Sequence, residues 1–68
     1  MTDVKMLEKK INNSGLSHTA IAAALNVSMP TYYSRKTGRS EFTASEIVKV
    51  MKVLKLTKEE RDAIFFGE

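Results

Sequence analysis

The side chains best suited to binding a charged ligand lie between residues 9 and 40. This stretch contains basic and hydroxyl side chains and no acidic ones. No Asp or Glu occurs from Lys9 to Arg39. Five cations fall in that stretch: Lys9, Lys10, Arg35, Lys36 and Arg39. This concentration of positive charge suits a phosphate-binding surface, because neutralising phosphates releases counterions and drives non-specific DNA binding. A solvated basic face without a ligand is the plainer alternative.

The sequence contains few residues of the types that catalyse reactions or bind metal ions. His18 is the only histidine, and there is no cysteine to act as a nucleophile or a metal ligand. The three glycines, Gly15, Gly38 and Gly67, are too far apart to form a phosphate-binding loop. We therefore expect neither an enzyme nor a protein that holds a cofactor or a metal ion.

The elements that must position the cations are two short helices joined by a tight turn, over about residues 17–37. Ser17 can cap the first helix, whose inner face is expected to carry Ala20, Ile21 and Ala24. Asn26 tolerates the left-handed conformation that such a turn needs. Ser28 can then cap the second helix, whose first turn contains proline. This arrangement predicts a helix-turn-helix, which can present its second helix to the major groove of DNA.

Three further helices are expected around this motif. The first would begin at Thr2–Asp3 and bury every third or fourth residue up to Ile11. Thr43–Glu46 and Thr57–Glu60 both have the capping-box pattern and should open two more helices. Of the final apolar run 64–66, two side chains should be buried and one exposed. The sequence thus predicts an all-α fold of five short helices, with residues 1–68 forming a single domain.

The motif resembles the helix-turn-helix domains of phage repressor and Cro proteins. The similarity rests on Ser17, Ala22, Val27–Ser28, Thr31 and Gly38, and it continues through residues 39–43 and the helix that follows. It implies a lambda-repressor-like fold and a transcription regulator that binds double-stranded operator DNA. The chain is similar in size and layout to the short Cro-like switch proteins of Gram-positive temperate phages, which include modulators of repression and antirepressors.

The resemblance and the chemistry of the side chains together assign a DNA-binding set. Its members are His18, Thr19, Met29, Thr31, Tyr33, Ser34, Arg35, Lys36, Arg39 and Ser40. His18 occupies the position where the family often has a phosphate-binding Gln. Strong base readers are Arg, Lys, Asn and Gln, and the first turn of the second helix has none of these. We therefore expect phosphate contacts to dominate and sequence specificity to be modest.

An apolar first turn also suits a protein ligand. Met29 and Tyr33 are expected to face outward, and both residue types are common at protein interfaces. The alternative function is therefore an antirepressor that binds the DNA-binding domain of a cognate phage repressor. Its contact residues would be Met29, Pro30, Tyr33 and Lys36.

Two further expectations concern location and assembly. The sequence has no signal peptide and no apolar run long enough to span a bilayer, so we expect a protein in the cytoplasm of a bacterial host cell without a membrane partner. The exposed member of the run 64–66 is a candidate contact for a homodimer formed through C-terminal residues.

Overall fold

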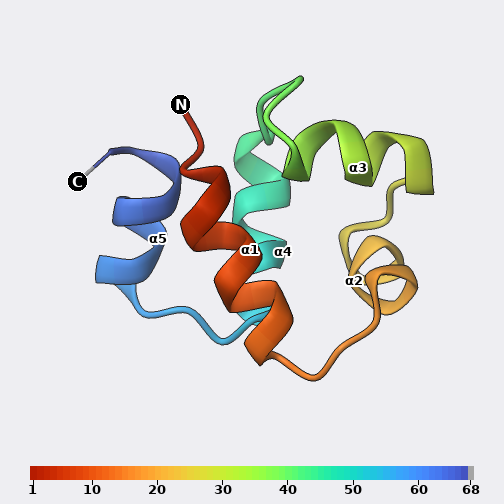
Figure 1. Ribbon diagram of the computed structural model, residues 1–68, viewed down its shortest axis with the longest axis horizontal. Coiled ribbons are helices and arrows are strands. Elements are labelled where there is room, and N and C mark those ends of the chain that lie inside the picture. Colours follow the sequence, from red (N-terminus) through yellow and green to blue (C-terminus); the bar gives the residue numbers. More distant parts are fainter. Residues whose placement is uncertain (68) are drawn as a thin grey trace.

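The computed structural model describes residues 1–67 and consists of helices joined by short loops (Figure 1). The helices are α1 (Val4–Asn13), α2 (His18–Leu25), α3 (Met29–Lys36), α4 (Ala44–Val53) and α5 (Lys58–Phe65). No strand occurs within residues 1–67. The predicted all-α fold of five helices is confirmed, and each helix begins within two residues of its expected position.

Local hydrogen bonds explain where the helices begin. Each helix is preceded by a residue whose side-chain oxygen accepts a bond from a backbone N–H of the first turn; these caps are Asp3, Ser17, Ser28, Thr43 and Thr57. At the start of α4 and of α5 the third helical residue, a glutamate, returns a bond to the cap, which completes the capping box. These bonds satisfy N–H groups that have no partner within the helix.

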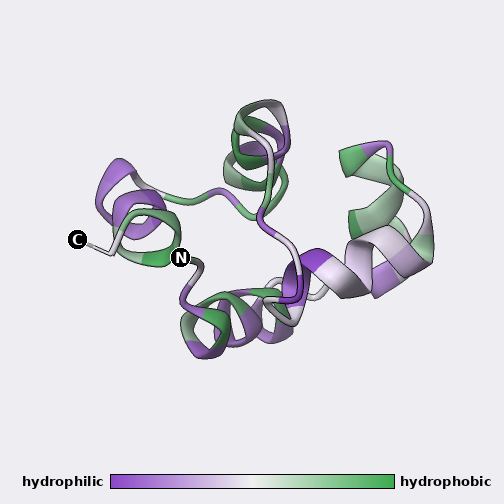
Figure 2. Ribbon diagram, turned by 90° about the horizontal axis from the view of Figure 1, so that it is seen from above, coloured by the Kyte–Doolittle hydropathy of each residue, from purple (hydrophilic) through white to green (hydrophobic). Residues whose placement is uncertain are grey.

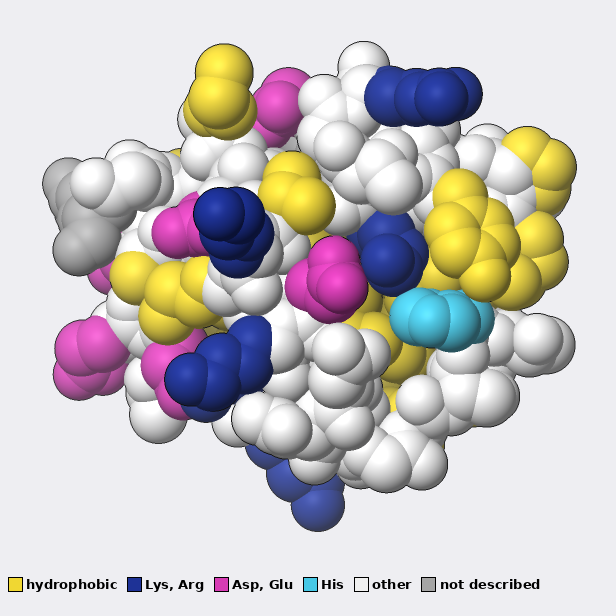
Figure 3. Space-filling model, in the orientation of Figure 1, with side chains coloured by type: hydrophobic (Ala, Val, Ile, Leu, Met, Phe, Trp, Pro, Cys, Tyr) yellow, Lys and Arg dark blue, Asp and Glu magenta, His cyan; other side chains and the backbone are white. Residues whose placement is uncertain are grey.

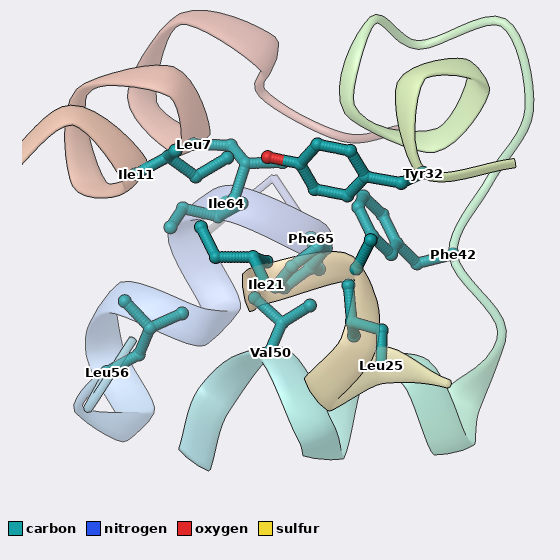
Figure 4. Close-up of a cluster of buried hydrophobic side chains, with 11 residues drawn as sticks. Leu7, Ile11, Ile21, Leu25, Tyr32, Phe42, Val50, Leu56, Ile64 and Phe65 are labelled. Atoms are coloured by element: carbon teal, nitrogen blue, oxygen red, sulfur yellow. The ribbon is translucent and has the colours of Figure 1, made fainter. Parts of the chain in front are cut away.

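The helices enclose a core of buried aliphatic and aromatic side chains (Figure 4). It contains Leu7, Ile11, Ile21, Ala22, Leu25, Tyr32, Phe42, Val50, Leu56, Ile64 and Phe65. α2 packs on α4, while α1 lies between α3 and α5 and contacts both. In Figure 1, α5 lies at one end of the molecule and the α2–α3 pair at the other. Every helix therefore contributes to one core.

The inner face of α2 differs from the expectation. Ile21 is buried, but Ala20 and Ala24 are exposed, and Ala22 and Leu25 are buried instead. Figure 2 shows why the pattern is ambiguous, because α2 is coloured hydrophobic along most of its length, whereas α3 is mostly pale or hydrophilic. A helix that is apolar on all sides gives no periodic signal, so packing on α4 decides which side is buried.

The C-terminal run of apolar residues matches the expectation. Ile64 and Phe65 are buried, and Phe66 is 56% exposed. Phe65 packs edge-on against Phe42, with the ring centroids 5.3 Å apart. Among the described residues, no helix has the length and apolar character needed to cross a membrane.

Candidate nucleic-acid interface

Helix α3 is fixed at both ends by backbone geometry. Ser28 caps its start through a bond from the Thr31 N–H. At its end, Gly38 adopts a positive φ of 85°, and its N–H donates to the Arg35 carbonyl. The N–H of Arg39 donates to the Ser34 carbonyl at 3.0 Å. These two bonds cap the C-terminus of α3, with Gly38 in the left-handed conformation that glycine favours. They also tie the backbone of Arg39 to α3.

The loop after α3 is also supported by the N-terminal segment. A Cβ atom at Gly38 would lie 3.1 Å from Cγ2 of Val4, so α1 approaches the loop closely. The buried hydroxyl of Thr2 donates to Glu41 at 3.3 Å. Arg39 therefore belongs to a loop that is held in place by contacts with the N-terminal segment, and its own side chain is exposed.

The outward face of α3 is a stripe of residues spaced three or four apart, which a helix places on one side. It consists of Pro30, Tyr33, Ser34 and Thr37, which together with Arg39 line a surface hollow of about 420 Å³. Figure 3 shows hydrophobic side chains gathered over α2 and α3, beside the single histidine. Thr37 was missed by sequence reasoning, although its spacing from Pro30 and Tyr33 would have indicated it.

The opposite face of α3 belongs to the core. Tyr32 is only 1% exposed. Met29 is half-buried and packs against the core, so its expected outward orientation is wrong. The reason is geometric, because Met29 lies three residues before Tyr32 and therefore on the same side of the helix. Of the predicted partner-binding residues, Pro30 and Tyr33 are exposed.

Arg35 is held by an ion pair rather than presented to solvent. Its Nε donates to Oε1 of Glu46 at 2.8 Å, and its Nη1 donates to Oγ of Ser40 at 2.6 Å. Burial raises the pKa of Glu46, but hydrogen bonds from Arg35 and Thr43 and the charge of Arg35 outweigh it and lower that pKa below its usual value. Arg35 therefore links α3, the loop and α4, and it is not the free cation that the sequence led us to expect.

Lys10 is neutralised in a similar way. Its ammonium group pairs with Glu60 on α5, fifty positions along the chain. Three cations of the acid-free stretch, Lys9, Lys36 and Arg39, have no acidic partner within the described part of the chain. Lys36 lies with its Nζ 5.9 Å from the ring centroid of Tyr33, which suits a cation–π contact. The free positive charge beside the outward face of α3 is thus carried by Lys36 and Arg39.

His18, the first residue of α2, is half-buried and joined to α3. Its Nδ1 lies 2.7 Å from the hydroxyl of Tyr32. Burial, assisted by the nearby Tyr33, raises the pKa of Tyr32 to about 12, so the hydroxyl keeps its proton. When this hydroxyl donates to Nδ1 of the neutral ring, the ring proton resides on Nε2, which is then a hydrogen-bond donor. This geometry suits the phosphate contact predicted for His18.

The remaining predicted residues are hydroxyl side chains, most of which already have partners. Thr31 accepts a bond from Oγ of Ser28 at 3.1 Å. Ser34 and Ser40 are joined by a bond of 2.8 Å between their hydroxyl oxygens. Thr19 is exposed. Residues 1–67 contain no cluster of three or more side chains that could hold a metal ion.

Comparison with known proteins agrees with this geometry. A helix-turn-helix family model matches residues 7–61, which include all of α2, α3 and α4, most of α1 and the first half of α5. No curated protein and no solved structure matched the chain. The matched region covers most of the 68 residues. The chain therefore belongs to the helix-turn-helix family of the Cro/C1 type, whose members are DNA-binding transcription regulators.

Proposed function

We propose that this protein regulates a phage-type genetic switch between lysis and lysogeny by placing α3 in the major groove of operator DNA. The observation that carries the DNA-binding part is the pair of unneutralised cations, Lys36 and Arg39, beside the exposed stripe of α3. His18 would add a phosphate contact from α2. The phage setting is supported by the resemblance of the motif to Cro-like switch proteins.

Specificity should come from few contacts. Of the hydroxyl groups on α3, that of Ser34 is bonded to Ser40, whereas that of Thr31 accepts a bond from Ser28 and keeps its own O–H as a donor. Thr31 and Tyr33 can therefore each offer one hydrogen bond to a base edge, and a single hydrogen bond discriminates less well than a bidentate pair. Phosphate contacts should therefore supply most of the affinity, and operator DNA should bind only modestly better than other sequences.

The test is a salt titration with a mixed-sequence 20-base-pair duplex. Arg39→Ala removes one cation from the proposed phosphate contacts, so the slope of log affinity against log salt should fall by about 0.9. Lys58→Ala is the matched control, because it removes the same charge at the start of α5, away from α3. Equal slopes for Arg39→Ala and the wild type would place Arg39 outside the DNA interface.

The exposed apolar face of α3 favours a second candidate function, the antirepressor. Pro30 and Tyr33 project from α3 beside a hollow that a side chain of a partner protein could fill. Calorimetry with a purified cognate repressor domain would test it. Tyr33→Ala should then weaken binding by about 1–2 kcal/mol, as truncation of an interface hot spot does. Absence of heat with that repressor would eliminate this candidate.

A homodimer through C-terminal residues is the assembly that we propose for either function. Phe66 stands beside an apolar hollow of about 430 Å³ between α4 and α5, lined also by Ala44, Ile47, Val48 and Arg61. A two-fold axis at this surface would place the ring of each copy in the hollow of the other. Sedimentation equilibrium should show self-association that Phe66→Asp abolishes. A wild-type protein that stays monomeric at millimolar concentration would contradict the proposal.

A further inference from the structure

The outward stripe of α3 presents more apolar surface than its residue types suggest. The hydroxyl of Thr37 donates to the carbonyl of Tyr33 at 2.6 Å, so only the methyl group of this side chain remains for a ligand. Ser34 is bonded to Ser40. Pro30 has no backbone N–H to offer. The apolar surface available to a ligand on this face is therefore a pyrrolidine ring, a phenol ring and a methyl group, and the hydroxyl of Tyr33 is the polar group that remains free among them.

The surroundings of this apolar stripe are cationic. Arg39 lines the same hollow, and Lys36 lies over the ring of Tyr33. Among residues 1–67, no acidic side chain lines the hollow. A ligand that fits has a small apolar group set within an anionic framework. In the major groove, thymine is the one base of ordinary DNA that presents such a group, its C5-methyl, and phosphates flank it on both strands.

We infer that the stripe formed by Pro30, Tyr33 and Thr37 recognises thymine through its C5-methyl group. This inference rests on the proposed DNA-binding function and specifies what α3 reads. The apolar side chains exclude water around the methyl group, while Arg39 and Lys36 hold the adjacent phosphates. Sequence specificity then arises from apolar contact between α3 and thymine methyl groups instead of from bidentate hydrogen bonds. Such contact would let a helix without Arg, Asn or Gln in its first turn select a DNA sequence.

The experiment compares duplexes that differ only in methyl groups. One pair is an alternating A·T duplex and its A·U counterpart, in which uracil lacks the methyl group of thymine. The other pair is an alternating G·C duplex and the same duplex with 5-methylcytosine, which adds a methyl group in the major groove. In fluorescence anisotropy titrations, removal should weaken binding and addition should strengthen it, each by about fourfold per contacted methyl group, equivalent to about 0.8 kcal/mol.

Variants identify the residues that sense the methyl group. Tyr33→Ala should bring the thymine-to-uracil affinity ratio close to one, whereas Tyr33→Phe keeps the ring and should preserve the ratio. Thr37→Ser keeps the hydroxyl bonded to the helix, loses the methyl group and should lower the ratio. Circular dichroism must show that each variant is folded, and Lys58→Ala should retain the wild-type ratio.

The possible failures can be told apart. Salt-dependent binding with equal affinity for all four duplexes would overturn the methyl inference and leave the DNA-binding function intact. Failure to bind any duplex at low salt would overturn both, and the apolar stripe would then be assigned to a protein partner. A ratio that survives Tyr33→Ala would overturn the assignment of methyl recognition to this stripe.

Discussion

Replacing Arg35 by methionine tests whether this cation supports the fold or binds DNA. Methionine keeps an unbranched apolar stem and removes both the charge and the donors. The change would break the bonds from Arg35 to Glu46 and to Ser40. The structure predicts a loss of stability without a loss of phosphate contacts, whereas the sequence alone predicts the reverse.

The expected loss of stability follows from the burial of the pair. The side chains of Arg35 and Glu46 are 22% and 11% exposed, so this pair is intermediate between a surface pair and a fully buried pair. A surface pair contributes at most about 1 kcal/mol, whereas disruption of a buried pair costs about 3–5 kcal/mol. Glu46 keeps its bond from the Thr43 N–H, so it is not left without partners. We expect a loss of about 2–3 kcal/mol, a large part of the roughly 3–10 kcal/mol typical for a domain of this size. The melting temperature should fall by about 10–20 °C.

Urea denaturation and salt-dependent DNA binding provide the two measurements. Lys36→Met is the matched control, because this neighbouring cation has no acidic partner and should cost under about 1 kcal/mol. At a temperature where the variant is folded, Arg35→Met should keep the wild-type salt slope. Unchanged stability together with a slope lowered by about 0.9 would refute the structural role and return Arg35 to the phosphate contacts.

The pH dependence gives the same experiment a second readout. The folded protein holds the pKa of Glu46 below its usual value, so the pair stabilises the fold above about pH 4.3 and this stabilisation is lost as the pH falls through the folded pKa. The difference in stability between wild type and Arg35→Met should therefore be largest near pH 7 and shrink below about pH 4. The pKa of Glu60 is also lowered, mainly by its hydrogen bond from Lys10. Because the substitution at Arg35 leaves this bond in place, Glu60 should contribute equally in both proteins and cancel from the difference.

Three further substitutions test the core and the helix ends. Phe65→Ala should cost about 3–5 kcal/mol because its ring is buried against Phe42, whereas Phe66→Ala should cost under about 0.5 kcal/mol; two mild losses in urea denaturation would contradict this packing. Lys55→Gly should stabilise the protein by about 0.5–1 kcal/mol, because Lys55 has a positive φ of 54° just after α4, where glycine is favoured. A lower melting temperature for this variant in calorimetry would count against that reasoning.

The sequence by itself determined the helices and their family. Helix starts depend on a cap and the three residues after it, and Ser28 and Thr43 show this pattern in the chain itself. These features were predicted correctly because the interactions that create them join residues only three or four positions apart.

Tertiary structure decided which charges remain free and which faces are buried. Glu46 lies outside the acid-free stretch, yet the packing of α4 beside the end of α3 brings it to Arg35. Glu60 reaches Lys10 because α5 lies against α1. Local patterns do not encode such pairs, because they depend on how helices distant in sequence pack together. The same packing ties Arg35 to α4 and leaves Pro30, Tyr33, Ser34 and Thr37 facing outward, with Lys36 and Arg39 beside them.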